Sequence, residues 1–195
     1  RYAVDSIETS RRASRPYAPY ITSTLQVAAS NVLGFTADRT MRVAQQLYQG
    51  LEVKGEGQIG LITYMRTDST HLSGDAIGMA REYISERHGG DYLPEKPRFY
   101  GSSNKDAQEA HEAIRPTDPR RTPDQVASAL TEEQLKLYRL IWNRFVACQM
   151  TDAQWDSTAV RFRRSDADTG AVLKATGRVL AFDGWTRVGG VAASD

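Results

Sequence analysis

Residues 60–70 read Gly-Leu-Ile-Thr-Tyr-Met-Arg-Thr-Asp-Ser-Thr, and this stretch is the most informative in the chain. A short apolar run ends in Tyr64, and the cation Arg66 follows two residues later. Side chains alternate between the two sides of an extended backbone, so Tyr64 and Arg66 are expected to share one side. A guanidinium holds phosphate oxygens with a planar fork of donors, and a phenol can serve as a nucleophile. The pattern therefore suits attack on a phosphodiester.

The composition is typical of a soluble globular protein. The chain has 195 residues, of which 40% are hydrophobic, enough for one large domain or two small ones. Lys and Arg total 25 against 24 Asp and Glu, a net charge of +1, so any basic surface for nucleic acid has to be local. The sequence holds no run of about 18 apolar residues, which argues against a membrane span.

Cysteine and histidine usage argues against a metal site in this chain. Cys148 is the single cysteine, so neither a disulfide within the chain nor a cysteine-based zinc site is expected, and an intracellular compartment fits. The histidines His71, His88 and His111 lack metal-ligand spacing. The sequence also contains no Gly-x-x-x-x-Gly-Lys-Ser/Thr loop, so no ATP site is expected.

The order of predicted elements is strand, helices, strands. Residues 2–9 are β-prone, and residues 11–19, which hold three arginines and two prolines, predict an extended linker. Helices are expected where hydroxyl caps precede apolar residues at helical spacing. The first helix is expected to start at 22–24 and end at Gly34, with Leu25, Ala28, Ala29 and Val32 buried. The second runs from Thr36 to Gly50, the third from Ser73 to Gly89, and a short one over 106–114. Two more are expected to begin at Thr122 and at Thr131. Extended segments are expected at 59–64, from 156 to 163, from 172, and around Val179 and Trp185.

This order favours an α+β fold with a mainly helical domain inserted into a small antiparallel β domain. The simplest assembly joins both chain ends into the β domain, because chain ends often lie close together. Residues 1–23 and 153–195 would form the two parts of the β domain, and residues 24–152 the helical one. The junctions at 16–23 and 151–156 are polar or rich in proline, so flexing is expected there.

Five blocks of sequence resemble, in the same order, the middle part of bacterial type IA DNA topoisomerases. They span nearly the whole chain and are specific when taken together. The blocks are Pro-Tyr-Ile-Thr-Ser-Thr-Leu-Gln (19–26), Thr-Met-Arg-Val-Ala-Gln-Gln-Leu-Tyr (40–48), the stretch 60–70, Ala-His-Glu-Ala-Ile-Arg-Pro-Thr (110–117) and Leu-Ile-Trp-Asn-Arg-Phe (140–145). The resemblance implies a helical gate domain, which carries the catalytic tyrosine, and a β arch domain.

The resemblance also implies an isomerase activity. Tyr64 would attack a phosphate of single-stranded DNA and become linked to the 5′ end. Another strand passes through the gap, and reversal of the reaction reseals the DNA. Negative supercoils are relaxed without ATP, because the phosphotyrosyl ester keeps the energy of the broken bond.

Three further residues are expected to act near Tyr64. Arg66 would stabilise the phenolate and the charge that develops on the phosphate. His111 matches the family's histidine near the catalytic centre and would pair with phosphate or with Asp68. Asp68 is expected to orient Arg66 or His111, with capping of the following helix as the alternative.

Three more residues are candidates for DNA binding. Thr63 and Thr67 could donate hydrogen bonds to phosphate oxygens, although hydroxyls are common at strand ends. Arg115 is expected to serve either phosphate binding or structure.

Two parts of the family's catalytic machinery lie outside this sequence. The family's toprim domain binds Mg²⁺ through an acidic cluster and supplies a glutamate for acid–base steps, and no Asp-x-Asp-x-x-Gly-like cluster occurs here. We therefore expect no metal and no ATP in this chain, and we expect that the isolated chain will not relax supercoiled DNA. The expected partners are single-stranded and negatively supercoiled DNA and the missing domains of the same polypeptide, in the cytoplasm at the nucleoid.

Two other functions are compatible with parts of the pattern. In a non-catalytic single-stranded DNA-binding or protein-interaction module, Tyr64 would be structural. A tyrosine recombinase would call for a larger set of Arg and His and for a tyrosine near the end of the chain, whereas Tyr64 lies early.

Overall fold

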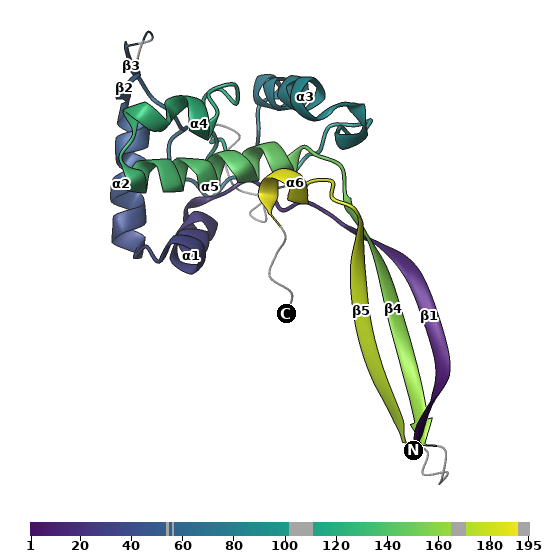
Figure 1. The fold of residues 1–195 in the computed structure, drawn as a ribbon. Helices are drawn as coiled ribbons and strands as arrows, with labels where there is room; N and C mark the ends of the chain where they lie inside the picture. The colour runs from purple at the N-terminus through teal and green to yellow at the C-terminus, as the bar shows by residue number, and fades with distance from the viewer. Residues whose placement is uncertain (54, 56, 102–110, 165–170, 191–195) are drawn as a thin grey trace.

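The computed structural model describes residues 1–53, 55, 57–101, 111–164 and 171–190. A body of helices carries a long three-stranded sheet that projects away from it (Figure 1). The strands of this sheet come from both chain ends, and helices α1 to α5 come from the residues between them. This arrangement confirms the predicted α+β class, with the helical part inserted between antiparallel strands.

The projecting sheet has the order β1-β4-β5 and is antiparallel throughout. Its strands are β1 (Tyr2–Ser14), β4 (Ala153–Arg164) and β5 (Val172–Phe182). The register pairs Tyr2 with Arg164 and Ser14 with Ala153. The predicted first strand, 2–9, was too short and the linker prediction was wrong for residues 11–14, because these residues pair with β4. The third extended region was also wrong, since Val179 belongs to β5 and Trp185 lies beyond it.

The main helices begin where the sequence predicted them. They are α1 (Thr22–Leu33), α2 (Ala37–Gln49), α3 (Gly74–His88), α4 (Pro123–Val126) and α5 (Glu132–Cys148). The side chains of Thr36, Ser73, Thr122 and Thr131 each accept a backbone N–H from the first turn that follows. Gly34 ends α1 with a left-handed backbone, φ 68°.

Short elements connect these helices. A hairpin of β2 (Leu51–Val53) and β3 (Gly57–Ile59) follows α2, and α6 (Thr186–Gly189) follows β5. Two 3₁₀ turns, η1 (Gly90–Tyr92) and η2 (Ala127–Ala129), follow α3 and α4. Beyond β3, the predicted extended segment at 59–64 makes a single isolated bridge, at Ile62.

The predicted helix at 106–114 is wrong over its described part. Residues 106–110 lie outside the described residues, and residues 111–114 are not helical. The backbone N–H groups of Ala113 and Ile114 donate instead to the carbonyls of His71 and Tyr20, at 2.8 Å each. Pairing with distant segments has replaced the local hydrogen bonds that a helix requires.

The core lies between α5 and the helices around it. Leu137, Tyr138, Ile141, Trp142 and Phe145 of α5 are buried. On α1 the prediction was partly wrong: Leu25 and Ala29 are buried, but Val32 is 67% exposed. The side of α1 that carries Leu25 packs against α2 and α5, while Val32 lies on the rim of a surface pocket described below.

The chain returns to the helical body after β5, because α6 packs against α5. Thr151, just before β4, is held there by two backbone bonds: its N–H donates to Tyr92 O (3.0 Å), and its carbonyl accepts from Trp185 N (2.9 Å). Most of the expected junction 151–156 belongs to β4. The division at residues 23/24 and 152/153 stays a prediction. Within the described ranges, no helix has the length and apolar character needed to cross a membrane.

Candidate active site around Tyr64

The segments 60–67 and 113–117 lie side by side through paired backbone hydrogen bonds. Thr63 N donates to Arg115 O (2.9 Å), and Thr117 N donates to Leu61 O (3.0 Å). Ile62 and Pro116 form an antiparallel bridge at the same place. Two blocks that lie about fifty residues apart in the sequence therefore form one unit.

The start of α1 completes this unit. Thr22 N donates to Thr67 O at 2.9 Å, and the Thr22 hydroxyl donates to Met65 O at 2.7 Å. Tyr20 bridges to Ile114. The blocks 19–26, 60–70 and 110–117, singled out separately in the sequence, thus meet around the tyrosine-bearing segment.

Side chains along the tyrosine segment alternate strictly between solvent and core. Tyr64, Arg66 and Asp68 are exposed, and Met65, Thr67 and Ser69 are buried. The extended backbone produces this alternation without a strand ladder, because residues 63–70 lie outside the strands. Tyr64 and Arg66 lie on the same side, as the sequence predicted, and Asp68 joins them.

Tyr64 lies against the end of α2. Its side chain is 48% exposed, and its ring meets the Tyr48 ring edge-on, with centroids 5.3 Å apart. Leu61 N donates to Leu47 O at 2.8 Å. Gly60 permits this approach, because a Cβ there would lie 2.7 Å from Tyr48 O. The last turn of α2 therefore holds the segment that carries Tyr64 in place.

Arg66, Asp68 and His111 are exposed, and none forms a hydrogen bond or ion pair with another residue in the described part of the chain. The expected orientation of Arg66 or His111 by Asp68 is therefore not seen. The alternative, that Asp68 caps the following helix, is wrong, because Ser73 caps α3. The three polar side chains stay available for a ligand.

Arg115 is a buried residue with structural partners. It is 9% exposed, and its guanidinium donates to Glu112 Oε2 (2.6 Å) and to Pro116 O (3.1 Å). Its Nε is buried and has no hydrogen-bond partner among the described residues. Of the two roles that the sequence left open, these contacts favour the structural one.

Glu112 links the same ion pair to the start of α3. Its Oε1 accepts from Ser73 N at 2.8 Å. Burial raises the pKa of Glu112, but the bonds from Arg115 and Ser73 outweigh burial, and the pKa lies below its ordinary value. The ionised Glu112 side chain therefore links the segment 111–117 to the start of α3.

The two threonines predicted to contact DNA use their hydroxyls within the chain. Thr63 Oγ1 donates to Ala113 O (2.8 Å) and accepts from Arg115 N (3.0 Å). Thr67 is buried, and its Oγ1 accepts from Ser69 N at 3.1 Å. Both side chains brace the segment in this structure, and their contact with DNA stays a prediction.

Sequence reasoning missed two features of the site, both on α2. One is Tyr48, which contacts Tyr64. The other is a cavity of about 290 Å³ beside Arg66, which α2 lines with four side chains. The signal was available in the helical spacing i, i+3, i+4 and i+7 of these four residues. They are Asp38, Met41, Arg42 and Gln45.

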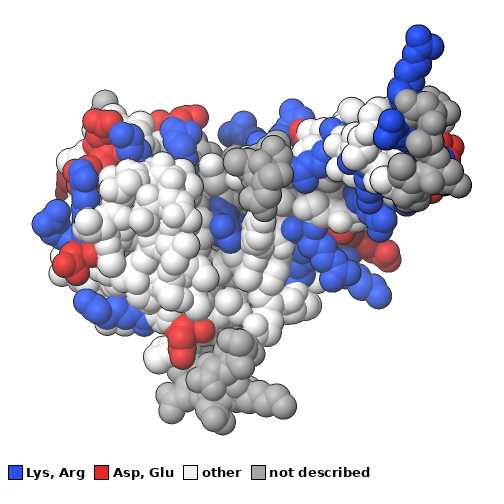
Figure 2. All heavy atoms as spheres, turned by 90° about the horizontal axis from the view of Figure 1, so that it is seen from below, with Lys and Arg blue, Asp and Glu red and all other residues white. Residues whose placement is uncertain are grey.

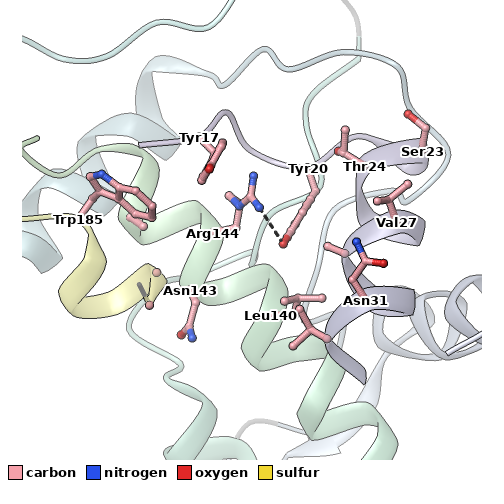
Figure 3. Close-up of a pocket in the computed structure, with 15 residues that line it drawn as sticks. Tyr17, Tyr20, Ser23, Thr24, Val27, Asn31, Leu140, Asn143, Arg144 and Trp185 are labelled. Atoms are coloured by element: carbon pink, nitrogen blue, oxygen red, sulfur yellow. Dashed lines mark hydrogen bonds between the residues drawn. The ribbon is translucent and has the colours of Figure 1, made fainter. Parts of the chain in front are cut away.

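A larger pocket, of about 720 Å³, lies where α1, α5 and α6 meet (Figure 3). Of the described residues that line it, only Arg144 is charged. The Arg144 guanidinium lies 4.9 Å from the Tyr17 ring centroid and 4.3 Å from that of Tyr20, and it donates to the Tyr20 hydroxyl at 3.2 Å. Burial raises the pKa of Tyr20. Tyr64 does not line this pocket.

The side of the helical body that carries α1 and α6 differs in character from the exposed row around Tyr64. Seen from below in Figure 2, the middle of this face consists mostly of uncharged side chains.

In the part of the chain that the structure describes, no group of three or more His, Cys, Asp or Glu side chains could hold a metal ion.

Comparison with known proteins matches this architecture throughout. The DNA topoisomerase family profile matches residues 1–195. The chain is 51% identical over 187 residues to DNA topoisomerase 1 of Haemophilus influenzae, a match that covers 96% of this chain and 20% of that relative. It is 50% identical over 188 residues to DNA topoisomerase 1 of Escherichia coli K12, with the same shares covered.

A solved structure agrees with the sequence relatives. Full-length topoisomerase I from Thermotoga maritima superposes with a TM-score of 0.85 at 39% identity, over 98% of this chain and 30% of that one. The chain spans about a fifth of the length of the curated relatives cited above. The resemblance of the five sequence blocks is thereby confirmed, and this chain belongs to the type IA DNA topoisomerase family.

Proposed function

We propose that Tyr64 is the nucleophile of a type IA topoisomerase and that this chain forms the part of the enzyme that presents it. One observation carries the proposal: an exposed phenol, an exposed guanidinium that has no partner among the described residues and an exposed carboxylate alternate along one braced segment. The segment is held by backbone bonds to 113–117 and to the start of α1. Such bracing holds a reacting group in place before the substrate arrives.

The proposed step is a transesterification that moves a DNA phosphate from O3′ of one nucleotide to the Tyr64 oxygen. The Tyr64 oxygen attacks phosphorus, the bond from phosphorus to O3′ breaks, and the DNA 5′ end becomes a phosphotyrosine. The phenol gives up its proton, and the leaving O3′ takes one up. The reverse step reseals the strand, so the bond energy is conserved and no ATP is consumed.

Arg66 and His111 have supporting roles in this proposal. Arg66 stabilises negative charge on the phosphate as the bonds exchange, because its guanidinium is always protonated and has no competing carboxylate partner among the described residues. His111 is exposed at the start of the segment that braces Tyr64, where an imidazole can contact phosphate. Arg115 and Glu112 maintain the geometry of the bracing segment.

Magnesium has no step assigned to it here. The described residues do not fit a metal site, and family resemblance assigns Mg²⁺ to the toprim domain. In the proposed setting, single-stranded and negatively supercoiled DNA are the substrates, and the toprim and other DNA-binding domains of the same polypeptide are the partners, in the cytoplasm at the nucleoid. The isolated chain is proposed to be inactive in relaxation.

The test is covalent trapping with the full-length protein. A suicide oligonucleotide should give a protein–DNA adduct that mass spectrometry maps to Tyr64. Tyr64→Phe should give none, whereas the control Tyr2→Phe, in the projecting sheet, should form it at the normal rate. An adduct on the Tyr64→Phe protein would refute the assignment.

A further inference from the structure

The cavity beside Arg66 is built from one side of α2 and from the residues that follow Tyr64. Asp38, Met41, Arg42 and Gln45 face Met65 and Arg66 across about 290 Å³. Met65 is fully buried, so it forms the floor next to the exposed Arg66. Since Tyr64 directly precedes these two residues, the cavity adjoins the proposed point of attack.

Two guanidiniums line this cavity, those of Arg42 and Arg66, and the charge of Arg42 also helps to lower the pKa of Glu133. Neither Arg42 nor Arg66 forms an ion pair or hydrogen bond with a described residue. Arg39 of α2 follows Asp38 in the sequence but is not among the residues that line the cavity. It forms an ion pair with Glu133, and its guanidinium carbon lies 4.5 Å from the centroid of the Phe35 ring. Glu133 therefore has its direct ion pair with Arg39, and Arg42 acts on it only through its charge, without a hydrogen bond or ion pair among the described residues.

The lining suits a phosphate better than a base. Its described lining residues combine two cations with the Gln45 amide, and none of them is an aromatic residue on which a base could stack. Among these described residues Asp38 is the one carboxylate, so their net charge is +1. Asp38 lies in the first turn of α2, where the helix dipole favours a carboxylate.

We propose that this cavity binds a backbone phosphate of the single strand next to the phosphate that Tyr64 attacks, with Arg42 as a second phosphate-binding residue beside Arg66. This inference rests on the proposed function for its place along the strand. Arg42 positions the strand by binding a phosphate that does not react, and Asp38 weakens the binding by repulsion.

The experiment measures binding of this chain to a fluorescent oligothymidylate by anisotropy over a series of NaCl concentrations. Each phosphate contact to a single strand contributes about 0.7 to the slope of log K against log salt. This slope is negative, so Arg42→Gln should make it shallower by about 0.7 and weaken binding roughly two- to fivefold at moderate salt. Asp38→Asn should strengthen binding. Arg139→Gln, which removes an equal charge from an Asp124 pair on another surface, is the matched control and should change neither quantity.

Two further arms separate this inference from others. An abasic strand should show the same loss with Arg42→Gln, because the site contacts phosphate; a loss seen only with bases present would overturn the proposal. Failure of the nucleophile assignment appears in trapping with the full-length Tyr64→Phe protein, whereas failure of the phosphate site appears in the salt series with Arg42→Gln. If Arg42→Gln matches Arg139→Gln in slope and affinity, or if this chain binds no strand, the inference is wrong. Circular dichroism of each variant checks the fold.

Discussion

The ion pair of Glu112 with Arg115 offers the sharpest test of how the active segment is held. Glu112→Ala removes a 2.6 Å contact to Arg115 and a 2.8 Å contact to Ser73 N. The Arg115 side chain is 11% exposed, so its charge would lose its carboxylate partner away from water. Breaking a buried ion pair costs about 3–5 kcal/mol. The Glu112 side chain is 27% exposed, so water can replace part of the interaction that the Arg115 charge loses. We therefore expect a loss of about 2–3 kcal/mol in the free energy of unfolding.

Urea denaturation followed by far-UV circular dichroism measures this loss, with an unchanged m-value as the check on compactness. Glu132→Ala is the matched control, because its pair with Lys136 is on the surface, and it should leave the urea midpoint nearly unchanged. The double variant Glu112→Ala with Arg115→Met should be more stable than Glu112→Ala alone, since it removes the orphaned charge. A Glu112→Ala protein as stable as the control would refute this account of the segment.

The same pair has a pH signature. The pKa of Glu112 is lowered in the folded chain from the ordinary 4.5. A lowered carboxyl pKa stabilises the fold fully above the unfolded value, and that stabilisation is lost as the pH falls through the folded value. The stability difference between wild type and Glu112→Ala should therefore be constant near neutrality and shrink below about pH 4.5. A stability difference that grows as the pH falls would contradict the lowered pKa of Glu112.

Three further predictions follow from single contacts. Gly60→Ala should lower stability by about 1–3 kcal/mol in thermal melts, because its Cβ would lie 2.7 Å from Tyr48 O, whereas Gly78→Ala, with open space around it, should not destabilise. The Cys148 thiol is buried, which raises its pKa to about 12, so a thiol reagent should label it only at the rate of unfolding; fast labelling of native protein would contradict this. Thr131→Ala should cost about 1 kcal/mol in urea by removing the cap on Gln134 N, and an unchanged midpoint would count against that cap.

Local chemistry explains which parts of the fold were predictable from the sequence. The caps at Thr36, Ser73 and Thr131 need only a hydroxyl three residues before a backbone N–H, so the sequence located these helix starts. The shared side of Tyr64 and Arg66 needs only an extended backbone. These features depend on neighbours within a few positions.

The errors and omissions all depend on distant partners. β1 continues to Ser14 because residues 11–14 pair with residues 153–156 of β4, a pairing that no local pattern contains. The segment 111–114 avoids a helix because it pairs with Tyr20 and His71. The cavity at Arg42 exists only once α2 packs beside residues 65–66.

The projecting sheet has little interior of its own. Of the described residues of its three strands, only Ala153 is buried, and the contacts between β1 and β4 include exposed pairs such as Arg161 with Glu8 and Arg163 with Asp5. Exposed ion pairs add little to stability and weaken in salt. We therefore expect the sheet to open separately from the α5 core and its amide hydrogens to exchange with solvent before those of that core.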